Sequence, residues 1–388
     1  MKKALKLTLS IIIIVVAALF AILFCVWGGE IKTLLSVERV AGNEYLYKME
    51  YKAGYDLDDV IGKDIDSNAK LMDYIIGKVG KGLPIGLHSS QVDGDQVGGC
   101  TSLQAKKADG EGYWYGRNYD FYKNPTMVTY SRPEKGYASI AVSDMSHFGY
   151  GLDNVPTSLA SKLMCLASIY APVDGINEKG LCTSIMAIPH QASQQESGRH
   201  KVGTSILMRV FLDRCATVTE AIEFVSSVDV RHDAKVGSGY HYMVADASGD
   251  CVIFEFDKFD GWKTVVLRKG DGQIPAVDSC GNSMLITNHL LGPKYRTEEP
   301  DASVGNPSSK SWDRYTRASA FLAANNGILT LEQMQECLAS VRWVDLPIDG
   351  DPRPEDTQYS NVYDQTNLTL SLRNWNRYDT TYFFALQK

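Results

Sequence analysis

A cysteine stands where a glycine-rich stretch meets the first strong hairpin pattern of the chain. Residues 98–102 read Gly-Gly-Cys-Thr-Ser, and residues 116–121 read Gly-Arg-Asn-Tyr-Asp-Phe. If these two segments pair as antiparallel strands, Arg117 and Asp120 come back beside Cys100. An arginine favours the thiolate of a neighbouring cysteine, and a carboxylate can orient an ammonium group. Such groups suit a nucleophile that cleaves amides, although the residue types alone also fit a buried structural cysteine beside an ion pair.

The elements that would position these residues follow an α+β pattern. Hairpins come first, helices lie between, and strands close the chain, which predicts antiparallel sheets. The expected helices cover residues 69–80, 158–170, 204–215, 218–227, 312–325 and 330–342. The expected strands lie near residues 45–51, 101–107, 113–121, 127–131, 137–142, 180–188, 240–246, 251–256, 359–363, 368–373 and 381–386. Neither a Gly-x-Gly-x-x-Gly motif nor a P-loop is present.

Several segments, in this order and spacing, resemble the choloylglycine hydrolase group. That group includes bile salt hydrolases and penicillin V acylases, which are linear amide C–N hydrolases of the N-terminal-nucleophile superfamily. The segments are Gly-Cys-Thr-Ser at 99–102, residues 116–121, Asp-Gly-Ile-Asn-Glu-Lys-Gly-Leu at 174–181, Ala-Thr-Val-Thr-Glu-Ala at 216–221, Ile-Thr-Asn at 286–288, Ser-Trp-Asp-Arg-Tyr at 311–315 and Tyr-Ser-Asn-Val-Tyr-Asp at 359–364. The resemblance covers roughly residues 100–388 and implies an αββα sandwich of two antiparallel sheets between helical layers.

The resemblance also implies a role for each matching residue. Cys100 corresponds to the N-terminal nucleophile, and its own α-amine, with an ordinary pKa of about 7.7–8.0, would act as general base. Arg117 and Asp120 correspond to the pair that flanks the nucleophile. Asn288 corresponds to the side-chain donor of the oxyanion hole, and Arg314 to the distal arginine that supports the site. The expected substrate is a small N-acyl amide, with no cofactor and no metal.

The sequence departs from the group at two places. Cys100 lies far from the start of the chain, so its amine exists only after cleavage between Gly99 and Cys100. We therefore expect a pro-segment at 30–99 and an amidase domain at 100–388. Ten residues beyond Asn177, bile salt hydrolases usually carry Asn and penicillin V acylases Tyr, whereas this chain has Ala187. The Ala187 backbone N–H can still donate to an oxyanion, but its side chain cannot recognise a substrate group, which argues against bile salt specificity.

The first 29 residues have the pattern of a membrane segment. Residues 11–27 lack polar side chains and follow three lysines, and a bilayer is spanned by about 20 mostly apolar residues. The pattern predicts an uncleaved single-pass anchor in the cell membrane, with the N-terminus cytoplasmic and the catalytic domain extracellular. A cleaved signal peptide and a secreted protein are the alternative.

Composition and charge narrow the remaining function classes. The 388 residues are 44% apolar and carry a formal net charge of −7, and without a Lys/Arg run this argues against nucleic acid as a partner. The eight cysteines form no Cys-x-x-Cys pair, and the seven histidines lack metal-ligand spacing. The long segment before Cys100 also resembles acid-ceramidase-like and isopenicillin acyltransferase-like relatives. Four further possibilities remain open: the protein is an acyltransferase, it is a non-catalytic surface binding protein, it retains its pro-segment, or it forms a homo-oligomer.

Overall fold

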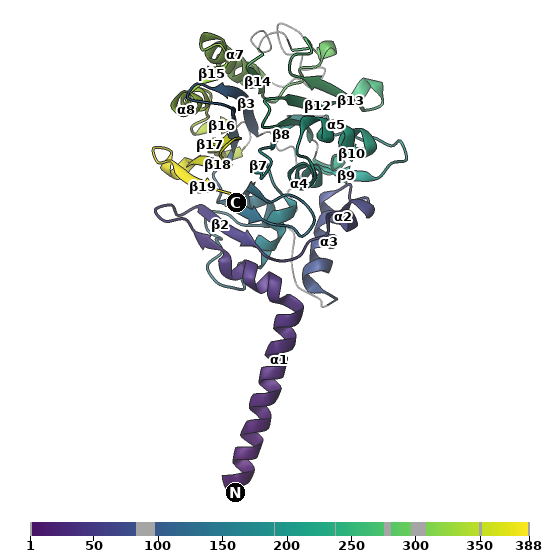
Figure 1. The fold of residues 1–388 in the computed structure, drawn as a ribbon, viewed down its shortest axis with the longest axis vertical. Helices are drawn as coiled ribbons and strands as arrows, with labels where there is room; N and C mark the ends of the chain where they lie inside the picture. Colours follow the sequence, from purple (N-terminus) through teal and green to yellow (C-terminus); the bar gives the residue numbers. More distant parts are fainter. Residues whose placement is uncertain are drawn as a thin grey trace.

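Two large β-sheets pack face to face, and helices cover their outer faces (Figure 1). The computed structural model describes residues 2–82, 98–189, 191–236, 238–274, 281–295, 308–348 and 351–386. Hydrogen bonds join the facing sheets. The Tyr115 Oη of one sheet lies 2.5 Å from the Ser184 Oγ of the other, and it also donates to the carbonyl of Met243. The expected α+β fold with two largely antiparallel sheets is confirmed.

The nine-stranded sheet joins strands from both sides of Cys100. In spatial order it contains β1 (Glu38–Arg39), β2 (Leu46–Tyr51), β5 (Thr126–Ser131), β6 (Ser139–Asp144), β7 (Asp174–Asn177), β8 (Cys182–Pro189), β11 (Ser238–Ala245), β12 (Cys251–Asp257) and β13 (Lys263–Arg268). All neighbours are antiparallel except β2 and β5, which pair in parallel over six residues. The segment before Cys100 is thus part of the main sheet.

The eight-stranded sheet carries Cys100 at the start of β3 (Gly99–Lys107), the strand next to its edge strand β14 (Ser283–Ile286). Its strands are β14, β3, β4 (Tyr113–Tyr122), β17 (Asp351–Asp364), β18 (Thr369–Asn374) and β19 (Tyr382–Ala385), with β15 (Ile328–Leu329) on β3 and β16 (Leu346–Ile348) on β17. A separate parallel pair is formed by β9 (Lys201–Gly203) and β10 (Asp229–Arg231). Strand β3 is buried along nearly its whole length, because the other sheet covers one face and helices cover the other.

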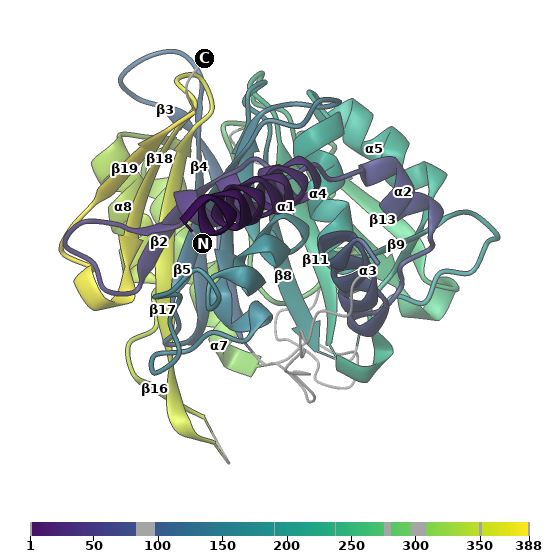
Figure 2. The same ribbon diagram turned by 90° about the horizontal axis from the view of Figure 1, so that it is seen from below.

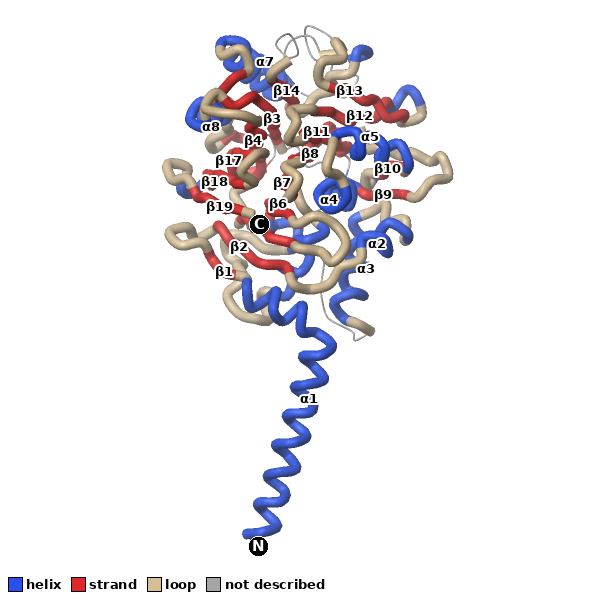
Figure 3. Tube along the Cα trace, viewed as in Figure 1, coloured by secondary structure: helices blue, strands red, loops and turns tan. Residues whose placement is uncertain are grey.

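Helices lie on the outer face of each sheet (Figure 3). The nine-stranded sheet is covered by α4 (Thr204–Arg214) and α5 (Val218–Ser227), and the eight-stranded sheet by α7 (Ser308–Ala324) and α8 (Leu331–Ser340). Helices α1 (Lys2–Ser36), α2 (Leu57–Gly62) and α3 (Asn68–Gly80) precede Cys100. Short 3-10 helices are η1 (Met145–Phe148), η2 (Leu163–Tyr170), η3 (Ala234–Val236), η4 (Lys258–Asp260), η5 (Pro293–Tyr295) and η7 (Trp375–Arg377).

Most expected elements are present, and their ends follow capping chemistry. Thr217 and Glu220 form the reciprocal capping box of α5, as its sequence predicts. The helix expected at 158–170 is wrong in extent, because only η2 forms there. Ser158 and Ser161 each accept a hydrogen bond from the backbone N–H of the other. Such local bonds compete with helical ones.

The structure does not support the membrane anchor that the N-terminal apolar run led us to expect. Within the ranges that the structure describes, no helix combines the length and the apolar character needed to cross a bilayer. The prediction of a single-pass anchor with an extracellular catalytic domain is therefore wrong. Helix α1 is broken at Trp27 by a non-helical backbone, and its last turns belong to the domain. There the Thr33 hydroxyl accepts from the N–H groups of Lys52 and Ala53. Figure 2 views the molecule from the side on which α1 lies.

Candidate active site

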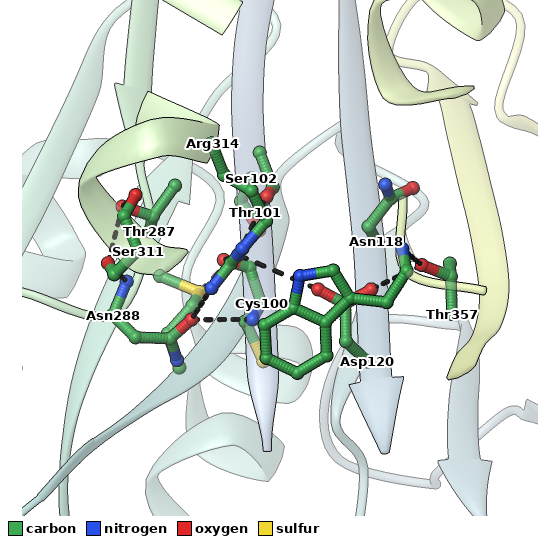
Figure 4. A network of polar contacts seen from close by, with 12 residues as sticks. Cys100, Thr101, Ser102, Asn118, Asp120, Thr287, Asn288, Ser311, Arg314 and Thr357 are labelled. Atoms are coloured by element: carbon green, nitrogen blue, oxygen red, sulfur yellow. Dashed lines mark hydrogen bonds and ion pairs between the residues drawn. The ribbon is translucent and has the colours of Figure 1, made fainter. Parts of the chain in front are cut away.

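Strand β3 places Cys100 next to β4, as the hairpin pattern predicts. In the antiparallel register Gly99 faces Asp120, Cys100 faces Tyr119 and Ser102 faces Arg117. The hairpin thus brings both charged residues beside the cysteine, and Figure 4 shows Asp120 reaching toward it from the neighbouring strand.

The thiol of Cys100 contacts a fully buried arginine. Arg117 Nη2 donates to Cys100 Sγ at 3.0 Å and to the Ile185 carbonyl at 2.7 Å. Burial raises the pKa of the Cys100 thiol, and the positive charge of Arg117 opposes this rise without cancelling it. The sequence led us to expect that Arg117 would favour the thiolate; its influence has that sign, but burial outweighs it.

Arg117 is itself positioned by Asp174, a residue to which the sequence analysis gave no role. Asp174 lies 3.9 Å from Arg117 Nε and accepts hydrogen bonds from Tyr359, Asn361 and Tyr363. These three residues alternate along β17 and so point to one face of the sheet. Residues 174–181, which contain Asp174, and residues 359–364 both carry the family resemblance. That resemblance was the only signal in the sequence for their contact.

The backbone of Cys100 is held by two further residues that the resemblance singled out. Its N–H donates to Asn288 Oδ1 at 2.6 Å, and its carbonyl accepts from Arg314 Nη1. Arg314 Nη2 also donates to Asn288 Oδ1 at 2.7 Å, and Nη1 donates to Thr101 Oγ1 at 3.0 Å. With two donors on one amide oxygen, the orientation of the Asn288 side chain is fixed.

The two expected oxyanion donors lie against one another. Asn288 Nδ2 donates to the Ala187 carbonyl at 2.8 Å, so the structure brings both to the same side of Cys100. The backbone N–H of Asn288 donates to Ser311 Oγ at 2.8 Å. Ser311 thus positions Asn288. The only hint of this role in the sequence was that Ser311 belongs to the same motif, residues 311–315, as Arg314.

Asp120 is a buried carboxylate next to the Gly99–Cys100 bond. Its Oδ1 accepts from Thr357 Oγ1 at 2.5 Å, and its Oδ2 lies 3.6 Å from Arg314 Nη1. Within the described residues Oδ2 has no hydrogen-bond donor. Burial raises the pKa of Asp120, while Arg314 and the Thr357 hydrogen bond act against the rise.

The indole of Trp343 closes the site on the side of Gly99, and sequence reasoning missed it. Arg314 stacks over this ring at 4.9 Å. A β-carbon on Gly99 would stand 2.4 Å from the ring and 2.8 Å from Asp120 Oδ2. Those separations are far below van der Waals contact, so only glycine fits at this position.

A cavity of about 260 Å³ opens at Cys100. Asp120 and Ala187 line it with Cys100, and Tyr119 and Tyr240 lie beside them. Burial, and secondly the proximity of Cys100, raise the pKa of Tyr240 to about 12. Apolar side chains make most of the remaining lining, so the arrangement presents a thiol at the edge of an apolar chamber.

The remaining candidate residues have structural roles or form no site. Asn177 binds only backbone groups here: Oδ1 accepts from the N–H groups of Lys179 and Leu181, and Nδ2 donates to two carbonyls of the α4 region. The seven cysteines that the structure describes are free thiols; Cys280 lies outside the described residues. Nowhere in the described ranges do three His, Cys, Asp or Glu side chains gather as a metal site would require.

Solved structures of known proteins share this fold. The fold resembles two solved structures of the conjugated bile acid hydrolase from Clostridium perfringens, each with a TM-score of 0.52, at 15% and 14% identity over 74% of this chain and 92% of theirs. Penicillin V acylase from Agrobacterium tumefaciens is similar at 15% identity over 74% of this chain and 84% of its own, with a TM-score of 0.44.

The chain belongs to the acyl-coenzyme A:6-aminopenicillanic acid acyl-transferase family, whose model matches residues 106–373. The match begins after Cys100 and takes in the segments that hold Arg117, Asn288 and Arg314. The family resemblance drawn from the sequence motifs is thereby confirmed.

Proposed function

We propose that this protein hydrolyses linear N-acyl amides with Cys100 as nucleophile. The observation that carries the proposal is that Arg117, Asn288 and Arg314 hold the thiol, the nitrogen and the carbonyl of Cys100, respectively, at the edge of the apolar cavity. A purely structural buried cysteine would need partners for its backbone groups, but not a buried arginine on its thiol.

The proposed first step is cleavage of the bond between Gly99 and Cys100. Cys100 Sγ attacks the Gly99 carbonyl carbon, the C–N bond breaks, and the thiol proton passes to the freed amine. Water then hydrolyses the resulting thioester, which leaves a carboxylate on Gly99 and an α-amine on Cys100. The tight packing around Gly99 supports this step, because it fixes the peptide bond beside the thiol. Residues 30–99 are then a pro-segment and residues 100–388 the amidase domain.

In the proposed turnover the new α-amine accepts the thiol proton, which burial would otherwise retain on sulfur. The thiolate attacks the substrate carbonyl, and Asn288 Nδ2 with the Ala187 N–H stabilises the oxyanion. The amine leaves with the proton held by Cys100, and an acyl-enzyme remains. Water attacks it to release the acid. Asp120 orients the α-amine, while Arg117 and Arg314 hold the thiol and the backbone.

Acyl transfer is the second candidate, and the family assignment favours it. The same acyl-enzyme would form, but an amine rather than water would take the acyl group. The contacts at Cys100 serve both outcomes.

The test is an amidase assay on the purified full-length protein with N-acyl amino acids, conjugated bile salts and penicillin V, each with and without an added acceptor amine. We expect release of the amine from at least one N-acyl compound, and none from the Cys100→Ala protein. Transfer products in the presence of the acceptor would assign the second candidate. Binding without turnover or chain cleavage would contradict both and assign a binding protein.

A further inference from the structure

One wall of the cavity at Cys100 comes from a helix that precedes Cys100 in the chain. Five residues of α3 line the cavity: Asn68, Ala69, Leu71, Met72 and Ile75. All but Ala69 recur at a spacing of three, four or seven residues from Asn68, which places them on a single helix face. Four of the five are apolar, so α3 presents an aliphatic stripe toward the thiol.

Helix α3 is held at both ends. At its start the Asn68 N–H donates to Asp233 Oδ2 at 2.9 Å. At its end Trp27 Nε1 donates to the Val79 carbonyl at 2.8 Å. Between them, Tyr74 packs edge-to-face on Tyr170 at 5.9 Å. These contacts keep the apolar stripe turned toward the cavity.

Other elements add apolar lining through Phe148, Val173, Ile185 and Val236. Polar and charged lining comes from His147, Asp233 and Lys235. At about 260 Å³ the space lies below the ~300–1,000 Å³ of pockets for drug-sized ligands. Such a chamber suits a flexible chain better than a rigid fused-ring system. Met72 adds an adaptable wall, because its unbranched side chain fills irregular gaps.

We propose that α3 forms the acyl-binding wall and that the preferred substrates are N-acyl amides with an unbranched aliphatic acyl chain. The inference rests on the proposed amidase function and names its substrate class. Leu71 and Met72 then limit the length of chain that fits. A segment lying before the cleavage point therefore determines specificity after cleavage.

The test measures kcat/KM of the full-length protein for N-acyl p-nitroanilides of increasing acyl length. We expect a maximum at one length. Met72→Trp fills the chamber and should move the maximum to shorter chains, with losses of about 10-fold to 200-fold per methylene that no longer fits. Leu71→Ala enlarges the chamber and should move the maximum to longer chains. Ile76→Ala is the matched control, because Ile76 lies on α3 but does not line the cavity; it should keep the wild-type maximum.

The possible outcomes distinguish failure of the acyl-wall inference from failure of the proposed amidase function. An unchanged length profile in both Met72→Trp and Leu71→Ala, or a preference for choloyl amides over every linear chain, would overturn the acyl wall. The amidase proposal would still stand if Cys100→Ala abolishes hydrolysis. No hydrolysis of any member of the series or of a choloyl amide by the wild-type protein would overturn both.

Discussion

The side-chain oxygen of Asn288 accepts the backbone N–H of Cys100 at 2.6 Å, while the side-chain nitrogen of Asn288 donates to the Ala187 carbonyl. One amide thus links the Cys100 nitrogen, the proposed general base, to the backbone of Ala187, the proposed second oxyanion donor. Its oxygen accepts from Cys100, and its nitrogen lies against the Ala187 carbonyl. We infer that Asn288 serves both the alignment of Cys100 and the stabilisation of the oxyanion.

Asn288→Ala should lower kcat about 10²- to 10³-fold, because one oxyanion donor is lost. It also removes the acceptor for Arg314 and for the Cys100 nitrogen. The measurement is kcat and kcat/KM of the fully processed variant. Ser311→Ala is the companion variant: it removes the hydroxyl that holds the Asn288 backbone and also contacts Thr287 and His289. It leaves the Asn288 side chain in place and should give a smaller loss. Wild-type kcat in Asn288→Ala would take this residue out of the oxyanion hole.

Arg117→Ala should move the acidic limb of the kcat/KM profile to higher pH. Burial raises the pKa of the Cys100 thiol, and Arg117 opposes that rise. Removal of the positive charge therefore raises the pKa further, and more alkaline solution is needed to form the thiolate. Arg117→Lys keeps the charge and should lie closer to wild type. If the acidic limb of Arg117→Ala does not move, Arg117 holds structure or substrate and does not tune the thiol.

Gly99→Ala should slow cleavage of the chain. The new β-carbon would stand 2.4 Å from the Trp343 ring, and overpacking of this kind typically costs about 1–3 kcal/mol. The relaxation would shift the peptide bond away from the thiol. Intact-mass measurement at fixed times after expression gives the cleaved fraction. Gly110→Ala is the control, since no atom lies within 4 Å of the added carbon; equal cleavage in both variants would show that the fit at Gly99 is not required.

The two chains produced by cleavage should remain together. Strand β2 pairs with β5 over six residues, and the hydroxyl of Tyr55 donates to Asp213 Oδ2 at 2.8 Å. Native mass spectrometry in mild buffer should find one complex, and denaturant should separate it. Tyr55→Phe removes one hydrogen bond to a carboxylate, worth about 1.5–3 kcal/mol, and should lower the denaturant midpoint of separation. Loss of the leading chain in mild buffer would contradict the retained pro-segment.

Local sequence patterns predicted much of the fold and the first contacts of the site. The hairpin that places Arg117 and Asp120 beside Cys100 depends on neighbouring segments and alternation, which the sequence shows directly. The resemblance supplied Asn288 and Arg314, although almost two hundred residues or more separate them from Cys100. All of these lie together in the structure.

Other parts could not be read from the sequence. Trp343 and Thr357 reach Arg314 and Asp120 only through the pairing of distant segments, and neither belongs to a recognisable motif. The pKa of the Cys100 thiol depends on how burial and the charge of Arg117 compare, and residue types do not reveal the extent of burial. The apolar run at 11–27 suggested an anchor because it was judged on composition alone, whereas α1 continues past it to Ser36 and its last turns contact the domain.

The central claim is that Cys100 becomes an N-terminus. N-terminal sequencing of the purified, active protein tests this most directly. We expect the larger chain to begin at Cys100, and Cys100→Ala to give a single uncut and inactive chain. A full-length, uncleaved protein with amidase activity would contradict the account.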